Sequence, residues 1–281
     1  MCVKMKIDEV RIDWLTAATW DDYKFRSVAF SWQSRQLRLD DDGEGAKRKD
    51  SKFMQYKGYV MAGVFFGTAV QGEESHYVVR ASGDVAHEFA TAVRLTGWRV
   101  TRMDIQLTVD MPKIYNSLAV MEQLEDAEWK GRKPEVSLQA NSSGMDTVYI
   151  GSRASESFVR QYVKQDSEGY RYLRYEMELK GDKASYAWSE FAKDPSVIGR
   201  FLKASLDGIP SGVWGVEMFK HRLAGVMAQR VKGRYVRSSG RILGWLEIQV
   251  GPAIRKWAHE HEMGPAIRQW LYEMNKEING E

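Results

Sequence analysis

Three segments of the chain alternate apolar and polar residues in the regular pattern of half-buried β-strands. They are TRMDIQLTVD at 101–110, FVRQYVK at 158–164 and YLRYEMELKG at 172–181. Successive side chains of a strand point to opposite faces, so each segment would bury one face and present a polar one. A short turn between the last two segments favours antiparallel neighbours. We therefore expect an antiparallel sheet in which the carboxylate strand lies next to the tyrosine strand.

The N-terminal part of the chain mixes further strands with helices. At 10–20, Val10, Ile12 and Trp14 alternate as in a strand. Asp84 suits the N-cap of a helix at 85–96, and Pro112 suits the first position of a helix that continues to Trp129. The charged run at 39–52 predicts an exposed loop. Further strands are predicted at 56–68 and 76–81, joined as a hairpin by 71–75, and at 147–153.

Beyond Lys183 the sequence becomes helical. Amphipathic spacing covers 185–208 and 213–233, and GPAIRKW at 251–257 recurs as GPAIRQW at 264–270, which we interpret as two helix starts. The fold class predicted from all these segments is α+β, an antiparallel sheet with packed helices plus a helical C-terminal region. The predicted domains are residues 1–183 and 184–281.

Composition narrows the environment and the kind of partner. The 281 residues contain a single cysteine, Cys2, so a disulfide framework is excluded and a reducing, cytoplasmic location is the expectation. No apolar run reaches the roughly 20 residues that span a bilayer, so no membrane partner is expected. A net charge of +3 excludes a dedicated nucleic-acid coat and confines any DNA contact to local basic patches. Such patches lie at 35–38, 47–49 and 230–241.

The polar faces of two of the alternating strands carry carboxylates. The first groups Asp104 and Asp110 with Arg102, and the other groups Glu176 and Glu178 with Arg174 and Lys180. A charged face is commonly just the solvated side of an antiparallel sheet. Carboxylates on two strands would equally suit a hard divalent cation, Mg²⁺ or Mn²⁺. The metal-ligand candidates are Asp104, Asp110, Glu176 and Glu178.

The third alternating strand places a tyrosine between two cations. In FVRQYVK, Arg160, Tyr162 and Lys164 share one face. A tyrosine hydroxyl can attack phosphorus covalently, but its ordinary pKa near 10 requires help from nearby charge. Arg160 and Lys164 would favour the phenolate and neutralise a phosphate. Tyr149 has the right parity to compete for this role, whereas Tyr175 falls on the apolar face of its strand.

The histidines do not offer an alternative metal centre. No His-hydrophobic-His motif is present, and His259 and His261 lie two residues apart in a predicted helix, where their side chains diverge. We interpret His76, His87 and His221 as isolated structural or surface residues.

Several blocks together resemble the replication initiation factor family, the rolling-circle initiators of plasmids and filamentous phages with related relaxases of conjugative elements. The resemblance extends over about residues 10 to 181, and the combination is more specific than any one block. The blocks are IDWL (12–15), VVRASGDVAHEF (78–89), VTRMDIQLTVD (100–110), TVYIGSRASESFVRQYVK (147–164) and RYEMELKG (174–181), with weaker support from WLEIQVGPAI (245–254).

The resemblance implies a rolling-circle-initiator-like nuclease fold and a DNA nicking and joining enzyme. Such an enzyme cuts one strand of double-stranded origin DNA at a single-stranded nick site, keeps a 5′-phosphotyrosine and releases a 3′-OH. By resemblance Tyr162 is the nucleophile, and Asp104, Glu176 and Glu178 bind Mg²⁺ or Mn²⁺. Val163 departs from the family, which commonly has Asp or Asn after the tyrosine. A host helicase and a second copy of the chain are the further partners that we consider.

Two other functions remain open at this point. One is a relaxase that starts conjugative transfer by the same nick, and the other is a DNA-binding regulator without catalysis. We place origin recognition in the basic segment 230–241 and the helical C-terminal region, where Arg and Lys can contact phosphates. The predicted DNA-contacting residues are Arg102, Arg153, Arg174, Arg230, Lys232, Arg234, Arg237 and Arg241.

Overall fold

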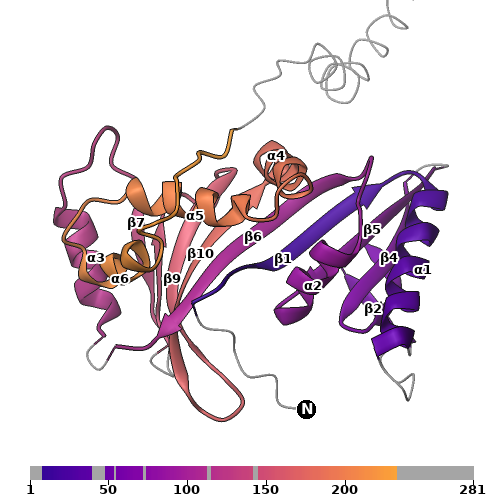
Figure 1. The fold of residues 1–281 in the computed structure, drawn as a ribbon, viewed down its shortest axis with the longest axis horizontal. Coiled ribbons are helices and arrows are strands. Elements are labelled where there is room, and N and C mark those ends of the chain that lie inside the picture. The colour runs from indigo at the N-terminus through magenta and orange to yellow at the C-terminus, as the bar shows by residue number, and fades with distance from the viewer. Residues whose placement is uncertain are drawn as a thin grey trace, which may run out of the picture. The chain divides into compact units, whose positions relative to one another are not determined.

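A computed structural model describes most of the chain before residue 233, and its strands form one antiparallel sheet (Figure 1). This confirms the predicted α+β class. The described residues are 8–39, 48–53, 55–71, 74–112, 115–141 and 145–232. The strands are β1 (Val10–Thr19), β2 (Arg48–Phe53), β3 (Tyr56–Met61), β4 (Val64–Gln71), β5 (Glu74–Ser82), β6 (Arg99–Asp110), β7 (Val136–Gln139), β8 (Thr147–Ile150), β9 (Ser157–Gln165) and β10 (Arg171–Lys180).

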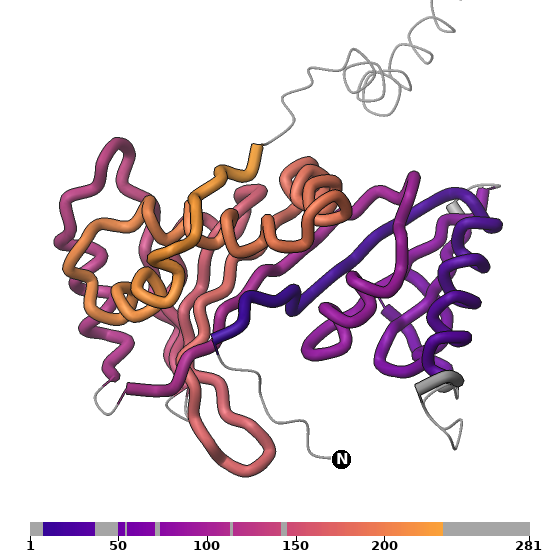
Figure 2. Tube along the Cα trace, in the orientation of Figure 1, coloured from indigo at the N-terminus to yellow at the C-terminus, as the bar shows by residue number. Residues whose placement is uncertain are grey.

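The strand order places the first and sixth strands together at the centre of the sheet. The order is β2-β3-β4-β5-β1-β6-β10-β9-β8-β7, and all neighbours are antiparallel. Figure 2 shows β1, in indigo, beside β6, in magenta, although a long stretch of chain separates them. The carboxylate strand β6 does not pair with the tyrosine strand β9, because β10 lies between them. The second carboxylate strand, β10, does pair with β9 as predicted.

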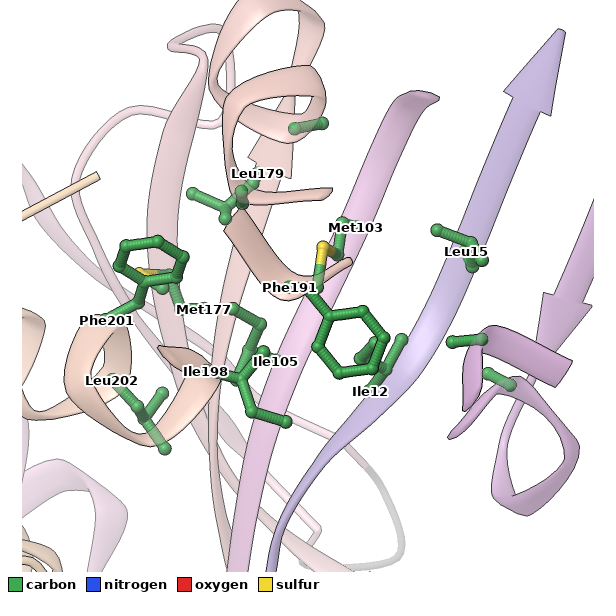
Figure 3. Close-up of a cluster of buried hydrophobic side chains, with 14 of the residues drawn as sticks. Ile12, Leu15, Met103, Ile105, Met177, Leu179, Phe191, Ile198, Phe201 and Leu202 are labelled. Carbon is green, nitrogen blue, oxygen red and sulfur yellow. The ribbon is translucent and has the colours of Figure 1, made fainter. Parts of the chain in front are cut away.

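Six described helices join the apolar side of the sheet in one hydrophobic core. Figure 3 shows part of this core, where side chains of β1, β6 and β10 point toward residues of α4 and α5. We call this side the helical face and the opposite side the outer face. The helices are α1 (Asp22–Leu39), α2 (Asp84–Ala92), α3 (Ser117–Asp126), α4 (Gly181–Phe191), α5 (Val197–Asp207) and α6 (Trp214–Arg222).

The sheet consists of two halves with the same topology. Each half has a strand, a helix, four strands in a meander and a second helix: β1-α1-β2-β3-β4-β5-α2 is followed by β6-α3-β7-β8-β9-β10-α4. In each half the last strand of the meander pairs with the first strand. The two halves meet where β1 pairs with β6, and Leu15 opposite Met103 marks the centre of this pairing. The chain therefore folds as an internal structural duplication with a pseudo-twofold axis.

Local contacts repeat at equivalent positions of the two halves. Gly83 and Gly181 both have positive φ, 67° and 53°, where the chain turns from a strand into a helix. An aspartate follows each glycine in the sequence. One turn into α2, the His87 ring accepts from the backbone N–H of Ile12 at 3.3 Å. One turn into α4, the Ser185 hydroxyl donates to the carbonyl of Val100 at 2.7 Å. The duplication thus extends to the way each helix attaches to its strand.

The hairpin and the charged loop of the N-terminal half differ from their predictions. Residues 56–68 are two strands, because Ala62 and Gly63 both adopt positive φ, 45° and 75°, and reverse the chain. The end of the predicted loop, from Arg48, forms strand β2. Helix α1 and strand β7 were not predicted from the pattern. The repeated starts at 251–257 and 264–270 lie outside the described residues.

The helices that were predicted begin or end at other residues than expected. Asp84 lies in the first turn of α2 and Gly83 is its N-cap. Asn116, rather than Pro112, precedes α3, and its side chain accepts from the backbone N–H groups of Leu118 and Ala119. The predicted helix 185–208 is divided into α4 and α5, with Pro195 between them.

The helices after Lys183 share the core of the sheet. Val197, Phe201 and Phe219 of α5 and α6 belong to the same hydrophobic cluster as β10. The core therefore continues across residue 183, where the composition changes. The role assigned to 184–281 stays a prediction. Among the described residues, no helix combines the length and apolarity that crossing a membrane requires.

A glycine on the outer face provides a test of the strand pairing. A Cβ added at Gly58 would lie 1.9 Å from the carbonyl oxygen of Phe66 and 2.6 Å from the Cα of Gly67. Both atoms belong to the backbone and cannot move away cheaply. We expect Gly58→Ala to lower the free energy of unfolding by about 2 kcal/mol or more. Gly225→Ala is the control, because no heavy atom lies within 4 Å of its added Cβ. Equal urea-unfolding curves for the two variants would contradict the described register.

Candidate active site on the outer face

The pairing register brings the three predicted polar strand faces together. On β6 and β10, Asp104 lies opposite Glu178. On β10 and β9, Glu176 lies opposite Arg160, and Arg174 lies opposite Tyr162. Each pair points to the outer face, since the alternate residues of these strands line the core. The sequence prediction that these side chains share one surface is confirmed.

The carboxylates at this surface are buried and paired with arginines. Asp104 and Glu176 have 0% exposure, and Glu178 has 4%. Arg102 Nε donates to Asp104 at 2.9 Å, and its Nη2 lies 2.9 Å from a Glu178 oxygen. Arg160 contacts all three carboxylates, at 3.3 Å for Asp104 and 3.6 Å for Glu178, with a direct hydrogen bond to Glu176. The cluster is therefore neutralised mainly by its own guanidinium groups.

Burial and pairing shift the pKa values of two of these acids in opposite directions. Burial raises the pKa of Asp104 to about 8, with a further rise from the charges of Glu176 and Glu178, although Arg102 opposes it. Burial would also raise the pKa of Glu176, but hydrogen bonds from Arg160 and Tyr162 outweigh it and lower the pKa. At neutral pH the arrangement favours a protonated Asp104 beside an ionised Glu176.

Tyr162 is attached to this cluster through its hydroxyl. The Tyr162 hydroxyl donates to Glu176 Oε2 at 2.8 Å. Burial raises the pKa of Tyr162 and the negative charge of Glu176 raises it further, while Arg174 lowers it. The predicted activation of Tyr162 by Arg160 and Lys164 stays a prediction. In this arrangement Arg160 is paired with carboxylates, and Arg174 is a further cation that favours the phenolate.

Lys164 lies on the same face, beyond Tyr162. Its side chain is half-buried and forms no ion pair within the described part of the chain. Burial lowers its pKa, and so does the positive charge of Arg174. A half-buried cation that forms no ion pair, on the same strand face as a tyrosine hydroxyl, suits the binding of an anionic group such as phosphate.

Asp13 is a site residue that the sequence pattern missed. Arg174 Nη1 lies 2.9 Å from Asp13, and its Nε donates to Thr108 at 3.0 Å. A β-bulge between Ile12 and Trp14 shifts the register of β1, so that these two residues do not share a face as predicted. The block IDWL contained the residue, but alternation alone could not reveal the bulge.

Other predicted site residues lie away from the cluster. Asp110 is exposed at the end of β6, opposite Tyr172 and about 20 Å along the strand from Asp104. Arg153 is exposed and stacks on Tyr149 at 5.1 Å. Arg230 lines a cavity of about 410 Å³ on the helical face. Lys232 is the last residue that the structure describes. Arg234, Arg237 and Arg241 lie outside the described residues.

The competing tyrosines have other partners. The Tyr149 hydroxyl donates to Gln139 at 3.1 Å, one strand beyond Tyr162. The Tyr172 hydroxyl donates to Asp166 at 3.0 Å. Tyr175 is fully buried on the helical face, where its hydroxyl lies 3.0 Å from the hydroxyl of Ser205. Tyr162 is therefore the tyrosine that joins the carboxylate cluster.

The donor chemistry of the cluster suits a hard divalent cation, but the present arrangement does not form a metal centre. Asp104, Glu176 and Glu178 offer carboxylate oxygens from two paired strands. These oxygens face guanidinium groups instead. Among the residues that the structure describes, no group of three or more His, Cys, Asp or Glu is arranged to hold a metal ion. Metal binding at these carboxylates would require Arg160 to move.

The raised pKa of Asp104 predicts a measurable pH dependence of stability. A carboxyl whose folded-state pKa exceeds its unfolded value of 3.8 stabilises the fold at low pH and loses that contribution as the pH rises toward 8. Asp104→Asn removes this loss. The quantity to compare is the unfolding free energy of the variant minus that of wild type. We expect this difference to rise by about 1 kcal/mol or more between pH 5 and pH 8. Urea unfolding measures it, with exposed Asp126→Asn as control. Parallel pH profiles for wild type and Asp104→Asn would contradict the assignment.

Comparisons with known proteins do not place the chain in a family. No family model matches it, and no curated protein matches it. One similarity among solved structures is to DynU16, a protein in the dynemicin biosynthetic locus, at 10% identity and a TM-score of 0.18. The match covers 75% of this chain and 94% of that one.

Proposed function

We propose that the protein is a DNA nicking and joining enzyme that initiates rolling-circle replication through a covalent 5′-phosphotyrosine at Tyr162. One observation supports it above the others: the hydroxyl of Tyr162 is hydrogen-bonded to Glu176 inside a cluster of three carboxylates and several cations. Tyrosine, proton acceptor and anion-binding groups are the parts that attack on a phosphodiester needs. The resemblance of the strand blocks to the replication initiation factor family points to the same reaction.

In the proposed reaction, the phenolic oxygen of Tyr162 bonds to phosphorus and the bond to the 3′ oxygen breaks. The phenol proton passes to Glu176, which accepts its hydrogen bond at 2.8 Å. The 3′ oxygen takes a proton from solvent and leaves as a hydroxyl. Joining is the reverse, in which a 3′-OH attacks the phosphotyrosine and Tyr162 regains its proton. No external energy source is needed, because the phosphotyrosine retains the energy of the phosphodiester.

The phosphate would be bound by the cations that surround Tyr162. Lys164 and Arg174 lie on the same face, and Arg174 is oriented by Asp13 and Thr108. A phosphate would also compete with the carboxylates for Arg160. If Arg160 turned toward the phosphate, Glu176 would become a stronger base, because Arg160 is the main group that lowers its pKa. Substrate binding would then prepare the proton acceptor.

Mg²⁺ or Mn²⁺ is the proposed cofactor, and Asp104, Glu176 and Glu178 are the residues that would hold it once Arg160 has moved. The ion would supply Lewis-acid polarisation of the scissile phosphate. Asp110 is not near enough to these three carboxylates to join them.

A second function, a DNA-binding regulator without catalysis, is favoured by a specific observation. Arg160 occupies the carboxylates, and the pKa of Tyr162 is raised rather than lowered. In such a regulator the cluster would serve only to fix β6, β9 and β10 together. A relaxase of a conjugative element would use the same nick, so the site geometry does not separate it from an initiator.

The test is incubation of the full chain with supercoiled DNA that carries its origin, with Mg²⁺ and with EDTA. The enzyme is expected to convert supercoiled circles to nicked circles only with the metal, and to leave protein bound to DNA after denaturation. Origin binding with no nick and no adduct under any divalent metal would support the regulator instead. Absence of salt-sensitive binding to any DNA would exclude both functions.

A further inference from the structure

We propose that the outer face of the first half of the duplication binds unpaired bases of a single-stranded nucleic acid by stacking. The proposal rests on a stacking patch, which we define as Trp14, Trp20, Phe53, His76 and Arg80. It deepens the proposed function, because it identifies where the strand that enters the tyrosine site would be held.

The centre of the stacking patch is Trp14, whose ring contacts two guanidinium groups. The guanidinium carbon of Arg102 is 4.5 Å from the centroid of the Trp14 ring, and that of Arg80 is 5.4 Å away. The Trp14 indole N–H donates to the hydroxyl of Thr16 at 2.8 Å, which fixes the ring. Arg102 belongs to the carboxylate cluster. The stacking patch is therefore in direct contact with the candidate active site.

Arg80 is a cation supported by aromatic rings. Its guanidinium carbon lies 4.3 Å from the Phe53 ring and 5.7 Å from the Phe65 ring. It forms no ion pair within the described ranges of the chain, whereas Arg102, Arg160 and Arg174 all do. Arginine stacked on aromatic rings keeps its hydrogen-bond donors free for phosphate and offers a planar surface to a base.

The other end of the stacking patch presents a stacked pair to solvent. The rings of Trp20 and His76 are parallel within 28° at a centroid distance of 4.3 Å, and Trp20 is 54% exposed. His76 Nδ1 is 2.6 Å from the hydroxyl of Tyr56, which holds the imidazole in place. Because the stacked His76 ring already fixes the exposed indole of Trp20, binding of another ring to the indole costs little conformational entropy. This is the property that base stacking requires.

Two glycines lie opposite each other on the outer face of β3 and β4. Gly67 faces outward between Phe65 and Ala69, and an added Cβ there would lie 2.5 Å from the Phe65 ring. Phe65 therefore lies across the strand where a side chain would otherwise stand. Gly58 is opposite Gly67 on the neighbouring strand. The outer face of β3 and β4 therefore has no projecting side chain at these two positions.

Equivalent positions of the two halves carry different charges on the outer face. The pairing registers make Thr16 equivalent to Asp104 and Arg80 equivalent to Glu178. Two carboxylate positions of the second half thus carry a hydroxyl and a cation in the first half. The acidic surface suits a reaction centre, whereas the cationic and aromatic surface suits the polyanion on which the centre acts.

The two surfaces lie at a suitable distance along one path. From β1 to β9 the sheet crosses three strand spacings, about 14 Å at roughly 4.8 Å each. The registers place Phe158 level with Trp14, and Tyr162 lies four residues, about 13 Å, further along β9, so the two positions are about 20 Å apart on the sheet. A single strand of DNA that stacks on Trp14 can therefore reach Tyr162 within a few nucleotides. A duplex cannot present its bases to the patch without unpairing, so the expected ligand is single-stranded.

The test measures binding of a fluorescent oligodeoxythymidylate of 20 nucleotides in EDTA, by anisotropy, with Tyr162→Phe as the parent so that no cleavage occurs. We expect Trp20→Leu and Trp14→Leu each to weaken binding by about 5- to 100-fold. An abasic oligomer of equal length should bind weakly and should not distinguish Trp20→Leu from its parent. Arg80→Gln should reduce the slope of log affinity against log salt concentration by about 1, which corresponds to one phosphate contact.

Trp214→Leu is the matched control, since Trp214 is 42% exposed and lies on α6, which packs on the helical face. Equal affinity of Trp20→Leu, Trp14→Leu and Trp214→Leu for the oligomer would overturn the stacking patch. Circular dichroism shows whether each variant is folded. If Trp14→Leu does not fold, Trp20→Leu still tests the patch, because Trp20 is exposed. If wild-type protein did not nick origin DNA but Trp20→Leu lost affinity for the oligomer, the proposed enzyme would be refuted and the stacking patch would stand. If wild-type protein nicked origin DNA but Trp20→Leu bound the oligomer as tightly as its parent, the stacking patch would be refuted and the enzyme would stand.

Discussion

Replacing Tyr162 by phenylalanine is expected to abolish the covalent adduct between protein and DNA and to reduce nicking by a factor on the order of 10⁴ or more. The substitution removes the nucleophilic oxygen and the hydrogen bond that it donates to Glu176 at 2.8 Å. The ring itself remains, so packing against Arg160 is retained. DNA binding is expected to persist, which separates loss of chemistry from loss of the substrate. The measurements are conversion of supercoiled circles and a denaturing gel that detects protein-linked DNA.

Tyr149→Phe is the matched control for this prediction. Tyr149 lies on the neighbouring strand β8, opposite Arg160, and on the same face, but its hydroxyl donates to Gln139 rather than to a carboxylate. This variant is expected to nick DNA and form the adduct at close to the wild-type rate. Full activity of Tyr162→Phe together with an inactive Tyr149→Phe would move the nucleophile to Tyr149.

Replacing Arg160 by methionine is expected to lower the free energy of unfolding at neutral pH by about 3 to 5 kcal/mol. Arg160 contacts Asp104, Glu176 and Glu178. Glu176 is fully buried, and without Arg160 its negative charge loses a partner that water cannot replace. Methionine fills a similar length without charge. Thermal or urea unfolding measures the loss.

Two further variants show whether the loss comes from unpaired charge. Arg153→Met removes an exposed arginine that stacks on Tyr149, and it should change stability by less than about 1 kcal/mol. Adding Glu176→Gln to Arg160→Met removes the buried charge as well, so part of the stability should return. If the double variant were no more stable than Arg160→Met, packing rather than charge would explain the effect.

The part of the candidate site that could be predicted is the face of the sheet on which each residue lies, because the alternation within a single strand determines it. Alternation in β6, β9 and β10 assigned Asp104, Tyr162 and Glu176 to one surface, because the period of a strand leaves two faces only. The same pattern could not show that Arg160 pairs with the carboxylates. That outcome depends on register, which places Arg160 directly opposite Glu176. Register is a property of two strands together.

The first half of the chain was harder to predict for physical reasons. The bulge in β1 moves Asp13 and Trp14 out of the simple alternation, and a bulge has no signature in one strand's sequence. Helix α1 has polar residues on much of its surface and only a weak apolar stripe, with Trp32 and Phe25 among the few buried members.

The duplication was invisible in the sequence because its two halves share few residues. Gly83 and Gly181 keep the positive φ that ends a strand and begins a helix. Most other equivalent positions differ, as Arg80 and Glu178 do. Packing constrains only the polarity of the buried positions, so two sequences can specify the same half-sheet and carry different outer faces. This difference is what divides the proposed roles of the two halves.

Mapping the adduct residue by mass spectrometry tests the central claim most directly. Wild-type protein is incubated with origin DNA and Mg²⁺, digested with nuclease and protease, and searched for a peptide that carries a nucleotide phosphate. The account predicts the modification on Tyr162, in the peptide released after Arg160. Nicked DNA with the modification on another residue, or with no modified peptide at all, would contradict it.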